Sequence, residues 1–180
     1  EERRSRIDSR PSAILNETVE ATLFKHHPYG TPIIGWENEM LDLTKDDAIA
    51  FYNKFYSPNN AVLVVAGDVD AQTVLKLATR IYGKVERRVD DIVRTRVVEP
   101  EPVTARTVEY EDPRVTRPAF SRVYLAPSYQ TAQGSEAEAL DVLADILGGS
   151  TTSRIYKSVI LEKEIATSAG AWFQGGALDM

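Results

Sequence analysis

The chain has 180 residues, of which 43% are hydrophobic and 27% are charged, and its 21 basic and 27 acidic side chains give a formal charge of −6. This balance is typical of an acidic globular protein and argues against nucleic-acid binding, which needs a clustered basic surface. No apolar run reaches the ~20 residues of a membrane-spanning helix. Without cysteine there is no disulfide, thiolate zinc site or cysteine nucleophile.

Both ends of the sequence are unusual. Residues 1–6 form a charged run that is typical of the interior of a helix, and neither Met nor a capping residue stands before it. Residues 166–180 alternate loosely like a strand and stop without a polar tail. We therefore expect a fragment of a longer protein or a processed chain.

Two helical patterns and a turn occupy the first thirty residues. Pro11 interrupts the opening helix, and a second helix follows with Leu15, Val19 and Leu23 on one face. Pro28 and Gly30 then bracket a turn.

The next part of the chain predicts helices packed on a sheet. Thr44 is the expected cap of a helix that reaches residue 55, with acidic residues in its first turn. Residues 61–65 are continuously apolar and largely β-branched, which predicts a strand buried in the core. A helix is predicted over residues 71–82, with Gly83 at its end.

A change of composition marks the predicted domain boundary. Residues 84–104 carry short charge clusters, few large apolar side chains and the Glu99-Pro100-Glu101-Pro102 run, which favours extended backbone. We predict domains over residues 1–90 and 105–180, joined by a linker over residues 91–104.

The second segment predicts the order β-β-α-α-β. Strand patterns cover residues 105–110 and 119–126. Ser135 can cap a helix that ends at Gly148-Gly149, a further helix covers about residues 153–163, and residues 166–173 return to strand character.

The sequence contains few combinations of residues that could form a catalytic site. There is no Gly-x-Ser-x-Gly motif for a serine nucleophile. The neighbouring His26 and His27 would point to opposite sides of extended backbone, so a structural or solvated role is favoured over metal binding. Residues 148–152 (GGSTT) could form an anion site but have no phosphate-loop lysine, so an inter-helical turn is favoured. The residues alone contain no complete catalytic centre.

A series of short motifs nevertheless follows a recognisable order. They are EERR at residues 1–4, HPYG at 27–30, IIG at 33–35, PNNA at 58–61, VVAGDV at 64–69, LGG at 147–149 and SRIY at 153–156. This ordered set resembles the M16 metallopeptidases, the relatives of insulinase, pitrilysin and mitochondrial processing peptidase, and above all their bacterial half-length subfamily.

The resemblance implies an α+β fold with α/β-type layers. It would have two related segments, each a mainly antiparallel sheet with helices packed on one side, as in one half of a metalloprotease clamshell. Residues 1–90 would complete the catalytic zinc domain, and residues 105–180 would begin its structural relative.

The resemblance also implies a zinc site to which this chain contributes one ligand. In the family an inverted His-x-x-Glu-His motif supplies two histidine ligands and the general base, and it is absent here. The distal glutamate ligand matches Glu2, with Glu1 the weaker alternative by register. We therefore expect no catalytic residue in this chain, an incomplete Zn²⁺ site, and no peptide hydrolysis by the chain alone.

Substrate and partner expectations follow from the same resemblance. The family's substrate-binding Arg and Tyr fall on Ile160 and Thr167 here, so that pair would come from a second M16-like half in a homodimer or heterodimer. Arg154 and Tyr156 are candidate peptide contacts, although a surface Arg and a packed Tyr are the favoured interpretation. Subfamily resemblance suggests the periplasm, with the cytoplasm open.

Three functions stay open at this point. The favoured one is a zinc-dependent endopeptidase acting on peptides or unfolded segments. The alternatives are a non-catalytic peptide-binding or scaffold subunit of the same family, and an unrelated small binding domain. An upstream His-x-x-Glu-His motif would favour the enzyme.

Overall fold

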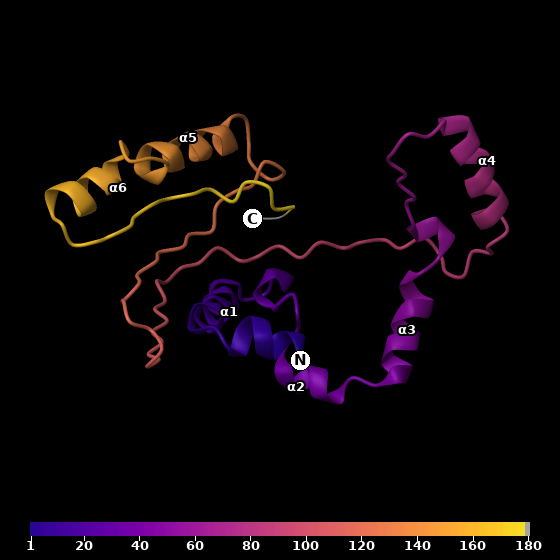
Figure 1. Cartoon of the computed structure of the whole chain (residues 1–180), viewed down its shortest axis with the longest axis horizontal. Helices are drawn as coiled ribbons and strands as arrows, with labels where there is room; N and C mark the ends of the chain where they lie inside the picture. The colour runs from indigo at the N-terminus through magenta and orange to yellow at the C-terminus, as the bar shows by residue number, and fades with distance from the viewer. Residues whose placement is uncertain (179–180) are drawn as a thin grey trace. The chain divides into compact units, whose positions relative to one another are not determined.

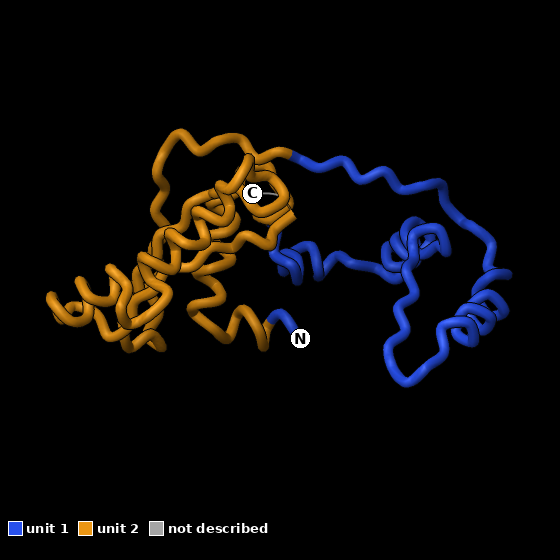
Figure 2. Tube along the Cα trace, turned by 90° about the horizontal axis from the view of Figure 1, so that it is seen from above, with its two compact units in different colours: residues 1–3, 31–97 blue, residues 4–30, 98–180 orange. Residues whose placement is uncertain are grey.

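The computed structural model describes residues 1–178, and the chain divides into two compact units, which Figure 2 shows in different colours. Unit 1 comprises Glu1–Arg3 and Thr31–Val97, and unit 2 comprises Arg4–Gly30 and Val98–Met180. The domain boundary at residues 91–104 stays a prediction, and residues 179 and 180 of the predicted second domain lie outside the described residues. Within residues 1–178, no helix is both long and apolar enough to cross a bilayer.

Unit 1 contains three α-helices and one short 3₁₀ turn. They are α2 (Glu37–Asp42), α3 (Lys45–Phe55), η3 (Pro58–Asn60) and α4 (Ala71–Tyr82). The helices over residues 45–55 and 71–82 confirm the two predicted for this part of the chain, whereas the sequence predicts neither the helix over residues 37–42 nor the 3₁₀ turn. The predicted cap of α3 is present: the Asp47 N–H donates to Thr44 Oγ1 over 3.2 Å, and the Thr44 N–H donates to Asp47 Oδ2 over 2.9 Å. This reciprocal capping box satisfies donors that the helix itself leaves unpaired. Helix α4 is capped by Asp70 and ends at Gly83.

The helices of unit 2 also lie where the sequence predicts them, except for a short 3₁₀ turn at the predicted turn over residues 28–30 (Figure 1). They are η1 (Arg4–Asp8), α1 (Pro11–Leu23), η2 (Pro28–Gly30), α5 (Glu136–Gly148), α6 (Arg154–Tyr156) and η4 (Lys157–Glu162). Pro11 begins α1, a position where its missing N–H costs no hydrogen bond. Ser135 stands at the N-cap of α5, but its side chain makes no capping hydrogen bond.

The predicted α+β fold with antiparallel sheets is wrong. No part of residues 1–178 forms a β-strand, and Figure 1 draws the predicted strands at residues 61–65, 105–110, 119–126 and 166–173 as coil. The physical reason is that a β-branched or alternating pattern reports only a preference for extended backbone. A strand forms when that backbone pairs with a neighbour, and these segments form no ladder of backbone hydrogen bonds with one another.

The prediction that residues 61–65 are core is also wrong. Val62 is 90% exposed and Val64 is 81% exposed. Among the described residues, the apolar side chain that counts as buried is Ala137. The buried polar residues are Arg3, His27, Ser57, Glu99, Ser128 and Ser153. Polar contacts therefore hold the irregular segments of this chain in place more than an apolar core does.

One close backbone approach in unit 2 depends on glycine. A Cβ on Gly148, the last residue of α5, would lie 2.0 Å from the nitrogen of Ala171 and 2.4 Å from the carbonyl carbon of Gly170. No side chain fits at such distances. The segment around residue 170 can therefore lie against the end of α5 only because residue 148 is glycine.

Candidate functional site

The predicted zinc ligand Glu2 lies at the surface beside an anchored residue. Glu1 and Glu2 are both exposed, whereas Arg3 is buried. The Arg3 guanidinium donates from Nη1 to the carbonyl oxygen of Gly35 over 2.9 Å. The backbone next to Glu2 is thereby tied to the chain just beyond the turn at residues 28–30. Glu2 as a zinc ligand, and Glu1 as its alternative, stay predictions.

The metal donors of the chain do not make a zinc site by themselves. A zinc site in a protein takes three or four protein ligands drawn from His, Cys, Asp and Glu. Within residues 1–178, no three such residues are grouped so that they could hold a metal ion. Zinc therefore does not fit the donor set of the described residues alone.

His27 is a packed residue of the turn that follows helix α1. It is 7% exposed, and its ring lies 4.3 Å from the Tyr29 ring and 5.9 Å from the Phe24 ring, measured between centroids. Its Nδ1 atom accepts the Tyr29 N–H over 3.2 Å. The neighbouring His26 is exposed. These contacts support the structural role that the sequence favours for His27.

Glu99 makes buried contacts that the sequence does not reveal. The residue is 4% exposed. It accepts three consecutive backbone N–H groups, from Lys25 to Oε1 over 2.7 Å and from His26 and His27 to Oε2 over 2.9 Å and 2.8 Å. We call this arrangement the Glu99 clasp. Burial on its own raises the pKa of Glu99, but the three N–H donors together with His26 outweigh it and lower the pKa below the ordinary 4.5.

Arg106 complements the Glu99 clasp at the end of helix α1. Its Nη1 group donates to the carbonyl oxygens of Thr22 and Leu23, the latter over 3.2 Å. The last carbonyls of a helix lack partners within the helix and carry partial negative charge, so a guanidinium is the matching group. The Glu99 carboxylate binds the N–H groups after α1, and the Arg106 guanidinium binds the last carbonyls of the helix. Together these contacts tie residues 98–106 to residues 22–27.

A third charged contact holds the start of unit 2. Arg114 donates to both carboxylate oxygens of Asp112, from Nε over 2.8 Å and from Nη2 over 2.6 Å. It also donates from Nη1 to the carbonyl oxygen of Ser9 over 2.9 Å. The Arg114 hydrogen bonds hold the pKa of Asp112 well below its ordinary value. Asp112 therefore stays ionised and orients Arg114 toward Ser9.

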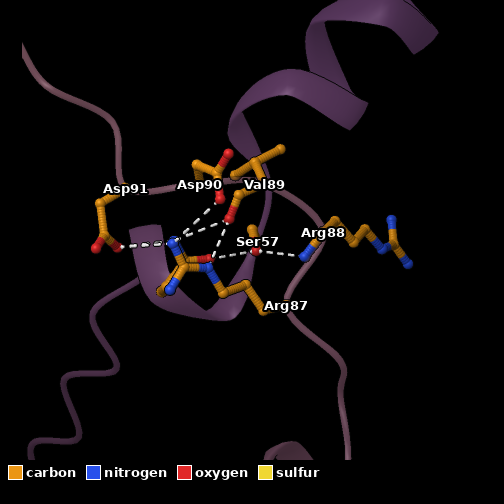
Figure 3. A network of polar contacts seen from close by, with 7 residues as sticks. Ser57, Arg87, Arg88, Val89, Asp90 and Asp91 are labelled. Carbon is orange, nitrogen blue, oxygen red and sulfur yellow. Dashed lines mark hydrogen bonds and ion pairs between the residues drawn. The ribbon is translucent and has the colours of Figure 1, made fainter.

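A polar network in unit 1 holds the turn after α3 against the chain after α4 (Figure 3). The Arg88 N–H donates to Ser57 Oγ over 3.1 Å, and Ser57 Oγ donates to Asn59 Oδ1 over 2.5 Å. The Asn59 amide donates to the Val89 carbonyl oxygen over 3.3 Å. Arg87 adds an ion pair with Asp91 at 3.3 Å. The network links irregular segments and brings together no pair of groups suited to acid–base chemistry.

The remaining candidate residues lie in unit 2 near α6. Arg154 is exposed and Tyr156 is half-buried, and neighbours two apart on a helix face different sides. Ile160 is half-buried and Thr167 is exposed. Their assignments from the sequence stay predictions. In the GGSTT turn, the Thr152 N–H donates to Ser150 Oγ over 3.3 Å, a local turn contact.

An apolar pocket lies along helix α3 in unit 1. It is lined by Leu43, Thr44, Asp47, Ala48, Phe51, Tyr52 and Tyr56. Its one carboxylate, on Asp47, is engaged by Thr44, whose hydroxyl and backbone N–H lower the pKa of Asp47. The pocket therefore offers mainly aromatic surface, and its one carboxylate is already held by Thr44.

Comparison with known proteins finds a matching protein family and similar proteins. The domain described as "Peptidase M16 inactive domain" matches residues 42–179. Zinc protease PqqE of Helicobacter pylori is 28% identical over 170 residues, which cover 94% of this chain and 38% of that protein. Uncharacterized zinc protease Rv2782c of Mycobacterium tuberculosis is 30% identical over 166 residues, which cover 89% of this chain and 36% of that protein.

A solved structure agrees with these sequence matches. The crystal structure of a protease from Helicobacter pylori matches with a TM-score of 0.69 and 26% sequence identity, over 94% of this chain and 40% of that one. The chain thus spans well under half of the length of the relatives it matches.

Proposed function

The chain belongs to the peptidase M16 family, and from that premise we propose that the whole protein is a zinc-dependent endopeptidase in which Glu2 is a zinc ligand. The observation that carries the proposal is the domain match over residues 42–179 together with relatives named zinc proteases. The place of Glu2 supports it: the carboxylate is exposed, and its neighbour Arg3 is anchored on Gly35.

The proposed division of the zinc site follows from the donors that this chain has. A catalytic zinc with three protein ligands keeps a position for water and activates it for attack on a carbonyl group. We propose that this chain supplies one carboxylate ligand and that the two histidines and the general base lie elsewhere in the whole protein. The isolated chain is then inactive.

The proposed substrate class is peptides or unfolded protein segments, held between this half and a second M16-like half. Within this chain, Arg154 and Tyr156 are the proposed peptide contacts. The exposed guanidinium of Arg154 can reach a peptide carbonyl or carboxylate, whereas the half-buried Tyr156 offers its ring edge. The whole protein's partner, whether a copy of itself or a related chain, is part of the same proposal.

A second function has one observation in its favour. The matched domain is described as the inactive domain of the family, which suits a non-catalytic subunit that binds peptides or supports a complex. The two proposals differ in the residues before Glu1. An intact His-x-x-Glu-His motif there supports the enzyme, and replaced histidines support the subunit.

Zinc stoichiometry tests the proposal most simply. The whole protein, dialysed without added metal, is expected to contain about one zinc per chain by elemental analysis. Glu2→Gln should lower that occupancy, because an amide oxygen is a weaker zinc ligand than a carboxylate. Glu1→Gln is the matched control and should keep the zinc. Unchanged occupancy in Glu2→Gln would contradict the assignment, and a folded, zinc-free wild type would favour the non-catalytic subunit.

A further inference from the structure

Three consecutive backbone N–H groups in unit 2 converge on one acceptor. The N–H groups of Lys25, His26 and His27 lie 2.7, 2.9 and 2.8 Å from the carboxylate oxygens of Glu99. Successive N–H groups that converge in this way form a nest, a concave piece of backbone that binds anions in many proteins. Such nests also capture the carboxylates of peptides. We call residues 25–27 the N–H nest.

The side chains around the N–H nest are basic. Lys25 and His26 are exposed beside it, and Arg106 donates to the last carbonyl oxygens of helix α1, directly before the nest. The carbonyl end of a helix carries partial negative charge that would repel an anion, and the Arg106 guanidinium offsets this charge. The surroundings of the N–H nest therefore favour a bound carboxylate, whether Glu99 or another group supplies it.

Glu99 reaches the N–H nest from a segment that has few other attachments. Its neighbour Val98 is 79% exposed, and Pro100 is exposed and has no N–H to donate. Within the described part of the chain, no backbone group of residues 98–106 pairs with another backbone group. The segment is thus held by the side chains of Glu99 and Arg106, and Glu99 can leave the nest without disrupting a helix.

We propose that the N–H nest is a carboxylate-binding site that Glu99 occupies as an intramolecular ligand, and that an acidic peptide binds there through one carboxylate when Glu99 is withdrawn. Residues 98–106 then act as an autoinhibitory strap, because Glu99 must leave before another carboxylate can reach the three N–H groups. A tethered ligand competes at an effective concentration on the order of millimolar, so the peptide binds weakly while Glu99 is in place. Neither zinc nor Glu2 takes part in this site, which lies within unit 2.

The first experiment asks whether the N–H nest accepts an external carboxylate. In Glu99→Ala of the 180-residue chain, amide hydrogen exchange at Lys25, His26 and His27 should become about tenfold faster or more, because the three N–H groups lose their acceptor. Sodium acetate should slow this exchange again, whereas sodium chloride at equal ionic strength should not. Exchange that is equally fast in acetate and chloride would overturn the proposal.

The second experiment tests the competition by Glu99 and the source of the carboxylate. One probe is an N-acetylated alanine tripeptide with a free C-terminus, and the other is its C-terminal amide with a central glutamate. At least one should shift the amide NMR signals of residues 25–27 and bind Glu99→Ala about tenfold or more tightly than the wild type. The probe that binds identifies the source as a C-terminus or an acidic side chain. Binding by neither probe, or equal affinity for the two chains, would contradict the site.

Control variants separate the N–H nest from its charged surroundings. Glu101→Ala removes an exposed glutamate two residues along and should bind the probes like the wild type. Lys25→Gln in the Glu99→Ala background keeps the backbone N–H and should keep most of the binding. Complete loss of binding there would assign the carboxylate to the Lys25 side chain and overturn the nest.

A second variant covers the case in which Glu99→Ala loses its helical circular dichroism. Glu99→Gln keeps the shape of the side chain, but its neutral amide holds the N–H groups less tightly than a carboxylate does. The probes should therefore bind Glu99→Gln more tightly than the wild type. Equal affinity of these two chains would again overturn the proposal.

Discussion

The two units of this chain hold their irregular segments in different ways. In unit 2, charged side chains bind backbone groups across long sequence separations: 72 residues or more for Glu99, 83 for the Arg106 contact with Leu23 and 105 for the Arg114 contact with Ser9. In unit 1, the network around Ser57 links residues only about thirty apart, mainly through a hydroxyl and an amide. In these two sets of contacts, the long connections of unit 2 are made by charged side chains and the shorter connections of unit 1 mainly by neutral groups.

The packing of α5 offers the strongest way to perturb unit 2. In Gly148→Ala the new methyl group would lie 2.0 Å from the Ala171 nitrogen, so the 170–171 segment must move away. The free energy of unfolding should fall by about 1–3 kcal/mol, the usual cost of overpacking. Urea unfolding followed by circular dichroism measures it. Gly176→Ala is the control, because a Cβ there meets nothing within 4 Å, and equal stability of the two variants would contradict the close approach.

The polar network of unit 1 can be disrupted by removing the Ser57 hydroxyl at its centre. Ser57 is 5% exposed, and Ser57→Ala leaves the Arg88 N–H and the side-chain Oδ1 of Asn59 without the Ser57 hydroxyl as partner. A loss of about 1–2 kcal/mol is expected. The chain has two tryptophans, and in a Trp172→Phe background the fluorescence of Trp36 reports on unit 1 during urea unfolding. The exposed Ser168 provides the control, Ser168→Ala, and a midpoint shift as large as that of Ser57→Ala would argue against the network.

The N-caps of two helices, one from each unit, allow the most closely matched comparison, and the expected effect on stability is the smallest. Thr44→Ala removes the hydroxyl that accepts the Asp47 N–H, leaves the bond from the residue-44 backbone N–H to Asp47 in place, and should cost about 1 kcal/mol. Ser135→Ala at the N-cap of α5 should change stability by less than about 0.5 kcal/mol, because the Ser135 side chain makes no capping hydrogen bond. Thr44→Ser should behave like the wild type. Equal losses in Thr44→Ala and Ser135→Ala would show that the two caps do not differ as described.

The helices could be predicted from the sequence because their signals are local. Thr44 stands three residues before Asp47, and Gly83 follows directly after the apolar stripe of α4, so both ends can be read within one or two turns. The sheet was predicted wrongly for the opposite reason. Residues 61–65 favour extended backbone, but pairing depends on distant residues, and Val62 and Val64 are exposed here.

Glu99 shows why much of the candidate site could not be predicted. Its neighbours Pro100 and Pro102 favour extended backbone, and nothing around it in the sequence indicates that its carboxylate binds three N–H groups more than seventy residues away. The only local signal is the pair of glutamates in a proline-rich stretch, and one of the two, Glu101, is exposed. Glu2, by contrast, could be assigned only by resemblance, since an exposed glutamate at a helix start is ordinary.

The pH dependence of amide protection tests the contrast between the two units most directly. Because the folded pKa of Glu99 lies below the ordinary 4.5, its stabilisation is fully present above that pH and is lost as the pH falls through the lower, folded pKa. The N–H of Arg88 is held by a hydroxyl, which does not titrate there.

Protection factors, which correct for the intrinsic pH dependence of exchange, should be measured for the wild-type chain from about pH 6 down to about pH 3. We predict that the protection of Lys25, His26 and His27 falls over the acid part of this range while that of Arg88 persists, and that Glu99→Gln abolishes the difference. Parallel pH profiles for Arg88 and the three clasped residues would contradict the account.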